Sequence, residues 1–333
     1  MTRLFVLLLL LLPTAYALTL NEALTNVDNR TAVVNAEAEL DNARVALART
    51  EADPLALRNE RVQARQRVEL AEAELTKARY DATTEISRAY TRAFEAERQV
   101  ALAAESVAVS EQALTIARIR FERGGATELD VRDAEQSLQD ARSNAAAARE
   151  GLQLARNNLA SLVTQDLGTL ASVPLVTLPP VPPLDAVLET SDELPNLVQA
   201  RQGRELARVG LELLDPSYAP QSQIDQAELQ LERAEESFGE ARRGISIQVR
   251  QLHNSALSAQ NDLQVRRSAL ENAEQRLAIE RQRLEGGLIA EISFLQTELS
   301  TLQARVATVQ AGHSYLLALL ELQAGSMYPL EVF

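Results

Sequence analysis

Apolar and small side chains recur along two stretches of this chain at spacings that alternate between three and four residues. The first series runs from Ala134 to Leu162, and the second runs from Ile292 to Leu320. A repeat that averages 3.5 residues keeps one face of a helix turned toward a partner under a left-handed supercoil. The pattern predicts long helices packed as coiled coils, and it fits either a closed tube or an ordinary antiparallel pair.

Glycine and proline divide the chain into helical stretches. Neither residue occurs between Pro54 and Gly124, and residues 221–285 contain no proline. Each stretch can therefore form one helix of about 100 Å at 1.5 Å per residue. Gly239 and Gly244 are expected to weaken the second helix only locally. Shorter helices are expected at 128–163 and 290–323, and helices of about 20 residues are expected before the Asp-Pro pairs at 53–54 and 215–216, because Asp-Pro favours a turn.

The glycine breaks belong to a block that occurs twice. Residues 120–131 read RFERGGATELDV, and residues 283–294 read RLEGGLIAEISF. In this register Gly124 matches Gly287 and Glu135 matches Glu298, and the segments 20–24 and 184–188 also resemble each other. A duplicated helical hairpin indicates a repeated assembly rather than a pocket enzyme. The predicted fold class is all-α, with two tandem long coiled-coil helical hairpins and no or minimal β-structure.

The positions of glycine and proline also predict the domain organisation. Residues 18–171 form the first helical repeat, 172–195 a proline-rich connector, 196–325 the second repeat and 326–333 a tail. The connector contains six prolines, which exclude a regular helix, so we expect it to be extended.

The first 17 residues have the pattern of a secretory signal peptide. Arg3 supplies a positive charge, residues 4–12 are uninterrupted apolar, and Ala15-Tyr16-Ala17 is a small-x-small cleavage site. The apolar run is too short to span a bilayer as a helix, which needs about 20 residues. The sequence thus predicts export to the periplasm, with Leu18 as the first mature residue.

Composition and charge narrow the chemistry further. The chain has no cysteine and a formal net charge of −14, so its surface repels nucleic acid and anionic lipid. No catalytic, phosphate-binding or metal-binding motif is present, and we expect no enzyme activity, cofactor or metal site. His313 falls on the heptad seam and is expected to fix packing or register, whereas His253 is expected on a solvated helix face.

The duplicated block and the leading segment at 18–24 resemble the TolC-like outer-membrane efflux protein family over essentially the whole mature chain. The resemblance implies a homotrimer that forms a twelve-helix periplasmic tube, associated with the outer membrane. It also implies a passive exit duct of a tripartite efflux or type I secretion system, working with a periplasmic adaptor protein and an inner-membrane pump. The hairpin tips would contact the adaptor through Arg120, Phe121, Gly124, Gly125, Thr127, Asp130, Gly286, Gly287 and Leu288.

The chain departs from this family at its membrane-facing segments. Family members insert a β-hairpin between the short and long helices of each repeat, and a spanning strand needs about 9–11 residues. Here the corresponding sites, 50–55 and 214–221, have room for a turn only. We therefore expect a chain that cannot itself form an outer-membrane pore. Two alternatives stay open: a periplasmic tube that docks onto a separate outer-membrane component, or a scaffold.

A second departure concerns the acids that line the aperture in the family. The positions that match them after the second tip hold Ser293 and Gln296, although Asp130 and Asp133 remain after the first. Glu285, Glu291 and Glu298 are candidate aperture acids, which would favour cation passage. The alternative is that they are solvated charges on a helix face.

Two other functions fit parts of the sequence. A periplasmic coiled-coil spacer or envelope scaffold would need the helices but no closed tube. A periplasmic adaptor of the membrane-fusion type also presents helical hairpins, but its hairpins are flanked by glycine-rich β domains that this sequence lacks. Oligomeric state separates the duct from the spacer, because a tube must close.

Overall fold

The computed structural model describes residues 17–174 and 178–330. Residues 1–16 of the expected leader and residues 331–333 of the tail lie outside the described part. The elements, in chain order, are β1 (Ala17–Leu18), α1 (Leu20–Leu24), η1 (Val27–Asn29), α2 (Thr31–Ala52), α3 (Arg58–Glu122), α4 (Glu128–Ala160), β2 (Thr169–Leu170), α5 (Leu184–Thr190), η3 (Ser191–Glu193), α6 (Pro195–Glu212), α7 (Gln221–Glu285) and α8 (Glu291–Ser326). The all-α prediction of two long helical hairpins is confirmed.

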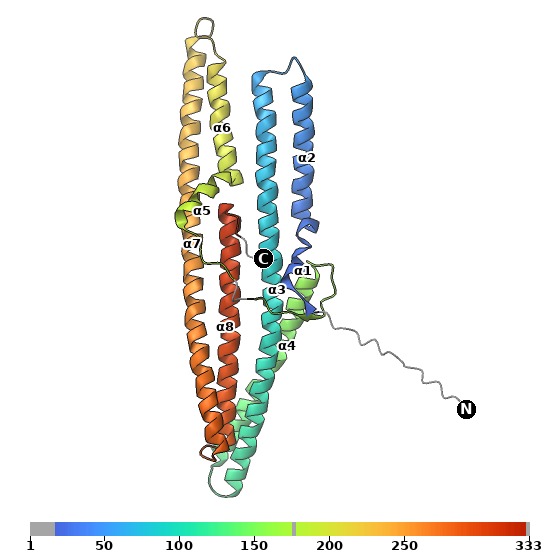
Figure 1. The fold of residues 1–333 in the computed structure, drawn as a ribbon, viewed down its shortest axis with the longest axis vertical. Coiled ribbons are helices and arrows are strands. Elements are labelled where there is room, and N and C mark those ends of the chain that lie inside the picture. The colour runs from blue at the N-terminus through green and yellow to red at the C-terminus, as the bar shows by residue number, and fades with distance from the viewer. Residues whose placement is uncertain (1–16, 175–177, 331–333) are drawn as a thin grey trace, which may run out of the picture.

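The helices stand in a row rather than in a closed bundle (Figure 1). α3 packs against α2 and α4 on one side and against α6 and α8 on the other, and α7 packs against α6 and α8. One outer edge of the row is therefore formed by α2 and α4, and the other is formed by α7. The tips that join α3 to α4 and α7 to α8 lie at one end of the molecule, and the turns that join α2 to α3 and α6 to α7 lie at the other.

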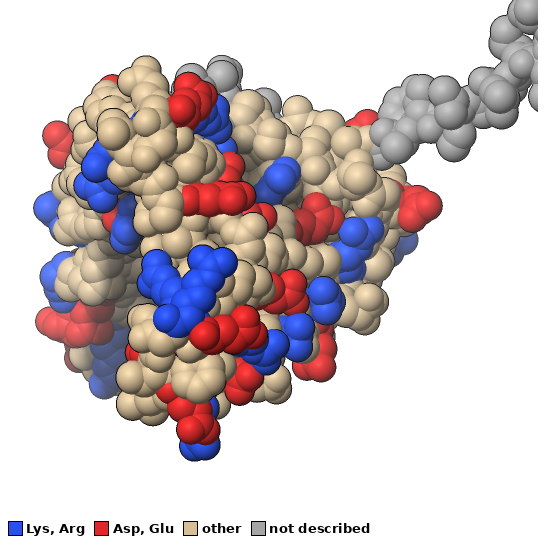
Figure 2. All heavy atoms as spheres, turned by 90° about the horizontal axis from the view of Figure 1, so that it is seen from below, with Lys and Arg blue, Asp and Glu red and all other residues tan. Residues whose placement is uncertain are grey.

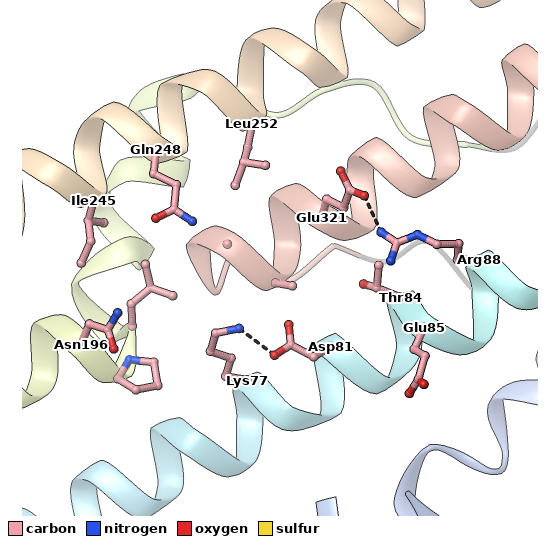
Figure 3. Close-up of a pocket in the computed structure, with 14 residues that line it drawn as sticks. Lys77, Asp81, Thr84, Glu85, Arg88, Asn196, Ile245, Gln248, Leu252 and Glu321 are labelled. Carbon is pink, nitrogen blue, oxygen red and sulfur yellow. Dashed lines mark hydrogen bonds and ion pairs between the residues drawn. The ribbon is translucent and has the colours of Figure 1, made fainter. Parts of the chain in front are cut away.

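The short helices α6 and α8 lie end to end along one line of the row (Figure 1). α6 begins at Pro195 close to where α8 ends, and residues of both line a cavity of about 490 Å³ together with α3 and α7. Figure 3 shows that charged side chains in this cavity pair within the chain: Lys77 with Asp81 at 2.7 Å, and Arg88 with Glu321 at 2.6 Å. The Arg88–Glu321 pair links α3 to α8 near the junction of α6 and α8, whereas the Lys77–Asp81 pair lies within α3.

The main core lies at mid-height, where the two hairpins meet. Ile86, Tyr90 and Phe94 of α3 are fully or almost fully buried, and they pack in one cluster with Leu159 of α4 and Leu316 of α8. Burying these large apolar side chains is the main source of stabilisation. α3 also contains an 18-residue stretch that could cross a membrane by length and composition alone, 17% of which is buried in the protomer.

A short parallel strand pair fastens the start of the described chain to this core. Ala17 pairs with Thr169 and Leu18 pairs with Leu170. The Tyr90 hydroxyl lies 2.7 Å from the carbonyl oxygens of both Leu18 and Ala171, which share its single proton. Burial raises the pKa of Tyr90 to about 12, because the low-dielectric surroundings disfavour the charged phenolate.

The helix lengths agree with those predicted from the glycine and proline positions, but the conformation of the connector differs from its prediction. α7 has the predicted bounds, and its two glycines do not interrupt it. Within 172–195, however, α5 and the 3-10 turn η3 follow Pro183, so the expectation of an extended connector is wrong for its second half. Proline is excluded from a helix interior but is tolerated at its start, and the proline run stops at the residue that precedes α5.

The structure confirms the expectation for one histidine and contradicts the expectation for the other. His313 is buried, its Nδ1 lies 2.7 Å from the Glu95 carboxylate, and its ring meets Phe94 edge-on, so the expected packing role is confirmed. The expectation that His253 is solvated is wrong. Its side chain is 8% exposed, and Nε2 lies 2.9 Å from the Pro182 carbonyl oxygen, because the connector covers this part of α7.

The turns at the other end of the row are short. Residues 53–57 join α2 to α3, and residues 213–220 join α6 to α7. In each turn an aspartate side chain precedes a proline and accepts a hydrogen bond from the amide two residues on, from Leu55 to Asp53 at 2.9 Å and from Ser217 to Asp215 at 2.8 Å. These Asx turns reverse the chain in a few residues, and neither described connection contains a strand.

Candidate docking site at the hairpin tips

Both tips use the same hydrogen-bonded turn to end a long helix. Gly124 donates to Phe121 at 2.9 Å and Gly125 donates to Arg120 at 2.8 Å, while Gly287 donates to Leu284 at 2.9 Å and Leu288 donates to Arg283 at 2.8 Å. This pair of bonds is the Schellman motif, which requires positive φ at one residue. That residue is Gly124 in the first tip, with φ of 73°, and Gly287 in the second, with φ of 69°.

The first tip restarts its helix with a complete capping box. Thr127 is the N-cap of α4, and its hydroxyl accepts from the Asp130 amide at 3.2 Å. The Asp130 carboxylate accepts in return from the Thr127 amide and hydroxyl, both at 2.7 Å. These bonds, the backbone bond first, lower the pKa of Asp130 because they stabilise its charged form. The expected site residues Thr127 and Asp130 thus form one structural unit.

The second tip restarts its helix without a side-chain cap. Ala290 is the N-cap of α8 and makes no side-chain cap bond, and Ser293 stands at the position that matches Asp130. Gly286 has ordinary helical φ, so it fills the helix end without a conformational requirement of its own. The second tip depends on the Schellman turn alone.

Apolar side chains project from both tips into solvent. Leu288 is 74% exposed, Leu129 is 65% exposed, and Phe121 and Ile119 are roughly half exposed. The site predicted from the sequence includes Phe121 and Leu288 but not Leu129 and Ile119. Leu129 lies within the duplicated block at 120–131, which was the available signal for it. Exposed apolar groups beside charged ones suit a protein contact.

Charged groups of both signs surround these side chains. Seen from the tip end, positive and negative groups are interleaved over the face rather than gathered in separate fields (Figure 2). Arg120 lies in the last turn of α3, and the end of α7 carries the Arg283–Glu280 pair at 2.8 Å. A basic residue near a helix C-terminus complements the helix dipole.

Two of the candidate aperture acids, Glu291 and Glu298, lack in the described part of the chain the ion pairs that their counterparts make in the first repeat. Glu128 pairs with Arg132 at 2.6 Å and Glu135 pairs with Arg118 at 2.7 Å. Among the described residues, no ion pair involves the matching Glu291 and Glu298, or Glu285.

Two local differences explain this contrast. The position that matches Arg132 holds Leu295, which supplies no positive charge. The position that matches Arg118 holds Arg281, whose guanidinium lies over the Phe294 ring at 5.8 Å. The structure therefore brings the acids of the second tip to the tip end with no ion pair to any cation among the described residues.

Among the described residues, no group of three or more histidine, aspartate or glutamate side chains could hold a metal ion. The tip end therefore presents exposed apolar side chains, charged side chains around them and two hydrogen-bonded turns.

The sequence profile described as "Outer membrane efflux protein" matches residues 55–165 and 196–325. These two segments include both long helices and both tips. Comparison of the sequence with curated proteins gives no significant match.

Solved structures of outer-membrane channels share the fold. The chain matches CusC with a TM-score of 0.67 at 15% identity, covering 93% of this chain and 96% of that one. It matches VceC from Vibrio cholerae with a TM-score of 0.60 at 18% identity, covering 93% and 97%. It matches the MtrE outer membrane channel of Neisseria gonorrhoeae in its open state with a TM-score of 0.62 at 16% identity, covering 92% and 88%.

The TolC-like resemblance is confirmed by these comparisons. Family and fold are those of channel proteins of the outer membrane rather than those of enzymes. The chain belongs to the outer membrane efflux protein family, as an efflux exit-duct component of the cell envelope.

Proposed function

We propose that three copies of this chain close into a periplasmic tube, associated with the outer membrane, that serves as the passive exit duct of a tripartite efflux or type I secretion system. A periplasmic adaptor would contact the tips, and an inner-membrane pump would supply the energy. The leader at 1–17 would direct export, and the repeats 18–171 and 196–325 with their connector 172–195 and tail 326–333 would form one protomer.

The observation that carries the proposal is a pair of exposed apolar stripes on the two open edges of the row. On α7, Leu229, Ile247 and Val265 are exposed at intervals of 18 residues, which is five helical turns. They therefore share one face of α7, and Ile279 continues the line toward the tip.

The opposite edge carries a comparable stripe that is divided between two helices. Val34 and Val45 of α2 are exposed about three turns apart, and Leu129 and Leu154 of α4 are exposed about seven turns apart. The two stripes belong to different faces of the chain, so joining them is a head-to-tail contact. Such contacts form a closed ring when the rotation between copies closes, and the row of helices would become the wall of the tube.

The tips supply the contact proposed for the adaptor. Phe121 and Leu288 are exposed apolar side chains on residues that take part in the two Schellman turns, so little conformational entropy is lost on docking. In a ring, Glu285, Glu291 and Glu298 would recur around the axis at the tip end. Because they lack a paired cation, they would give the aperture a negative field.

The first experiment measures the mass of the exported protein by light scattering without detergent. A trimer supports the duct, whereas a monomer or dimer supports the spacer or scaffold. A trimer that forms only in detergent would mean that the stripes alone do not drive closure.

A second experiment tests the edges directly. The chain has no native cysteine, so Leu154→Cys on α4 and Val265→Cys on α7 can be combined without background. The proposal expects oxidation to link separate copies into trimers. A control variant combines Leu57→Cys with Val265→Cys. Because Leu57 lies away from the edge, oxidation should not link copies of this variant. Equal linking of both pairs would contradict the edge contact.

A further inference from the structure

The end of the molecule opposite the tips carries its own group of exposed apolar side chains. Leu55 is 85% exposed and Tyr218 is 88% exposed, and Leu57 and Leu213 are also exposed. They lie on the turns 53–57 and 213–220, which stand at the same end (Figure 1). We refer to these two turns as the blunt end. Arg58, the first residue of α3, pairs with Glu212, the last residue of α6, at 2.9 Å, which holds the two turns at one level.

The backbone N–H groups at the blunt end are bonded within the chain. Leu55 and Ala56 donate to the Asp53 side chain and carbonyl, and Leu57 donates to the Glu60 carboxylate at 2.8 Å. On the other turn, Ser217 donates to the Asp215 side chain, and Tyr218 and Ala219 donate to its carbonyl oxygen.

The remaining three positions of the segments 54–57 and 216–220 are prolines, which have no N–H. Every amide donor of these two segments therefore has a partner within the chain. An N–H without a partner would cost several kcal/mol in an apolar medium, and the N–H groups of these two segments avoid this penalty.

Charged groups beside the turns also make hydrogen bonds or ion pairs within the chain. The Asp53 and Asp215 carboxylates each accept a bond from their own turn. The Arg61 guanidinium donates to the Asp53 carbonyl at 3.2 Å, and Arg65 pairs with Glu51 at 2.9 Å. The projecting residues themselves, 54–57 and 216–220, are uncharged. This contrasts with the tip end, where Glu285, Glu291 and Glu298 have no paired cation.

We propose that the blunt end inserts shallowly into the surface of a zwitterionic phospholipid bilayer. Leucine and tyrosine on narrow turns suit the interface, since tyrosine places its ring at headgroup level. A protein socket is less well matched, because the apolar groups stand on two separate turns rather than on one continuous patch. The inference rests on the outer-membrane association in the duct proposal and adds how the contact is made, and three copies would strengthen the binding.

The test uses the absence of tryptophan from the chain. Tyr218→Trp places the only indole at the blunt end, and Leu288→Trp places it at the tips as a matched control of similar exposure. Each exported variant is mixed with phosphatidylcholine and phosphatidylethanolamine vesicles that contain a brominated lipid. We expect a blue shift and quenching for Tyr218→Trp and neither for Leu288→Trp.

Three results would overturn the proposal. The first is an unchanged Tyr218→Trp spectrum at saturating lipid, and the second is equal quenching at both positions. The third is a Tyr218→Trp shift that requires solubilised envelope protein and not lipid, because a protein would then cover the blunt end. None of these outcomes depends on whether the protein forms a trimer, so failure here and failure of the duct proposal are distinguishable.

A partition measurement gives the size of the effect. Leu55→Ser combined with Tyr218→Ser removes two side chains that make few contacts in the fold, and should weaken vesicle binding about tenfold or more. Leu288→Ser, in an exposed turn at the other end, should leave binding unchanged. Adding anionic lipid should not strengthen the wild-type binding, since the protein carries a net charge of −14. Equal binding of the double variant and the wild type would contradict the inference.

Discussion

The first and second hairpin tips end their long helices in the same way but begin their short helices differently. Gly124 and Gly287 adopt the same left-handed conformation, and the same pair of backbone bonds closes both turns. The first tip then adds the Thr127–Asp130 capping box and ion pairs for Glu128 and Glu135, whereas the second tip has Ala290 and no ion pair for the matching Glu291 and Glu298 among the described residues. The duplicated block therefore preserves the chain reversal and varies the chemistry displayed beside it.

The largest expected effect tests what the tips share. Gly124→Ala and Gly287→Ala should each lower local stability by about 1 kcal/mol, because a Cβ is disfavoured at positive φ. Hydrogen exchange at each tip, followed by mass spectrometry, measures the loss. Gly125→Ala is the matched control, since Gly125 has no positive φ and should tolerate the methyl group. Unequal losses at the two tips would show that the turns are not equivalent.

The next effect tests what separates the tips. Thr127→Ala should destabilise the start of α4 by about 1 kcal/mol, because it removes the N-cap acceptor. Installing the box in the second tip with Ala290→Thr and Ser293→Asp should stabilise the start of α8 by a smaller amount. Amide protection in the first turn of each helix reports both changes. No gain from the double substitution would mean that another feature of the second tip opposes capping.

Acidification should affect the first tip more than the second. The pKa of Asp130 is lowered in the folded state, so its contribution is fully present above the ordinary value of 3.8 and is lost as pH falls through the lowered value. Protection of the α4 amides, corrected for intrinsic exchange rates, should fall in this range while that of the first α8 turn changes less. Asp130→Asn should remove the difference. A pH dependence that persists in this variant would assign it to another group.

The ion pairs should give the smallest effect. Arg132→Ala should cost about 0.3–0.5 kcal/mol, since exposed pairs one helical turn apart contribute little. Leu295→Arg should offer Glu291 the partner that Glu128 already has. The gain should vanish at high salt, where exposed charges are screened. A salt-independent change in stability would indicate packing by the long side chain rather than pairing.

The sequence predicted most of the fold because local residues set its boundaries. Pro220 and Gly286 flank α7, and Gly124 and Thr127 mark the end of α3 and the start of α4. The short helix α5 was missed because the prolines before it dominate the composition of the connector. The burial of His253 was also missed, since it depends on a connector that crosses α7 from a distant part of the chain.

The candidate site was predictable in its turns but not in its pairing. The positive φ at Gly124 and Gly287 follows from the chain reversal at a glycine. Whether an acid finds a cation depends on side-chain placement across two helices. Arg118 reaches Glu135 in the first hairpin, whereas the matching Arg281 lies over Phe294 in the second. Sequence alignment of the two repeats alone would have paired both.

The small parallel strand pair also constrains the order of folding. Leu18 and Leu170 flank the whole α3–α4 hairpin in sequence, so their pairing closes a loop that contains it. Closing so long a loop is entropically costly until the hairpin has collapsed. Tyr90 of α3, whose hydroxyl proton is shared by the carbonyl oxygens of Leu18 and Ala171, is placed correctly only after that collapse. We therefore expect the strand pair to form late in folding, so that its formation indicates a complete first hairpin.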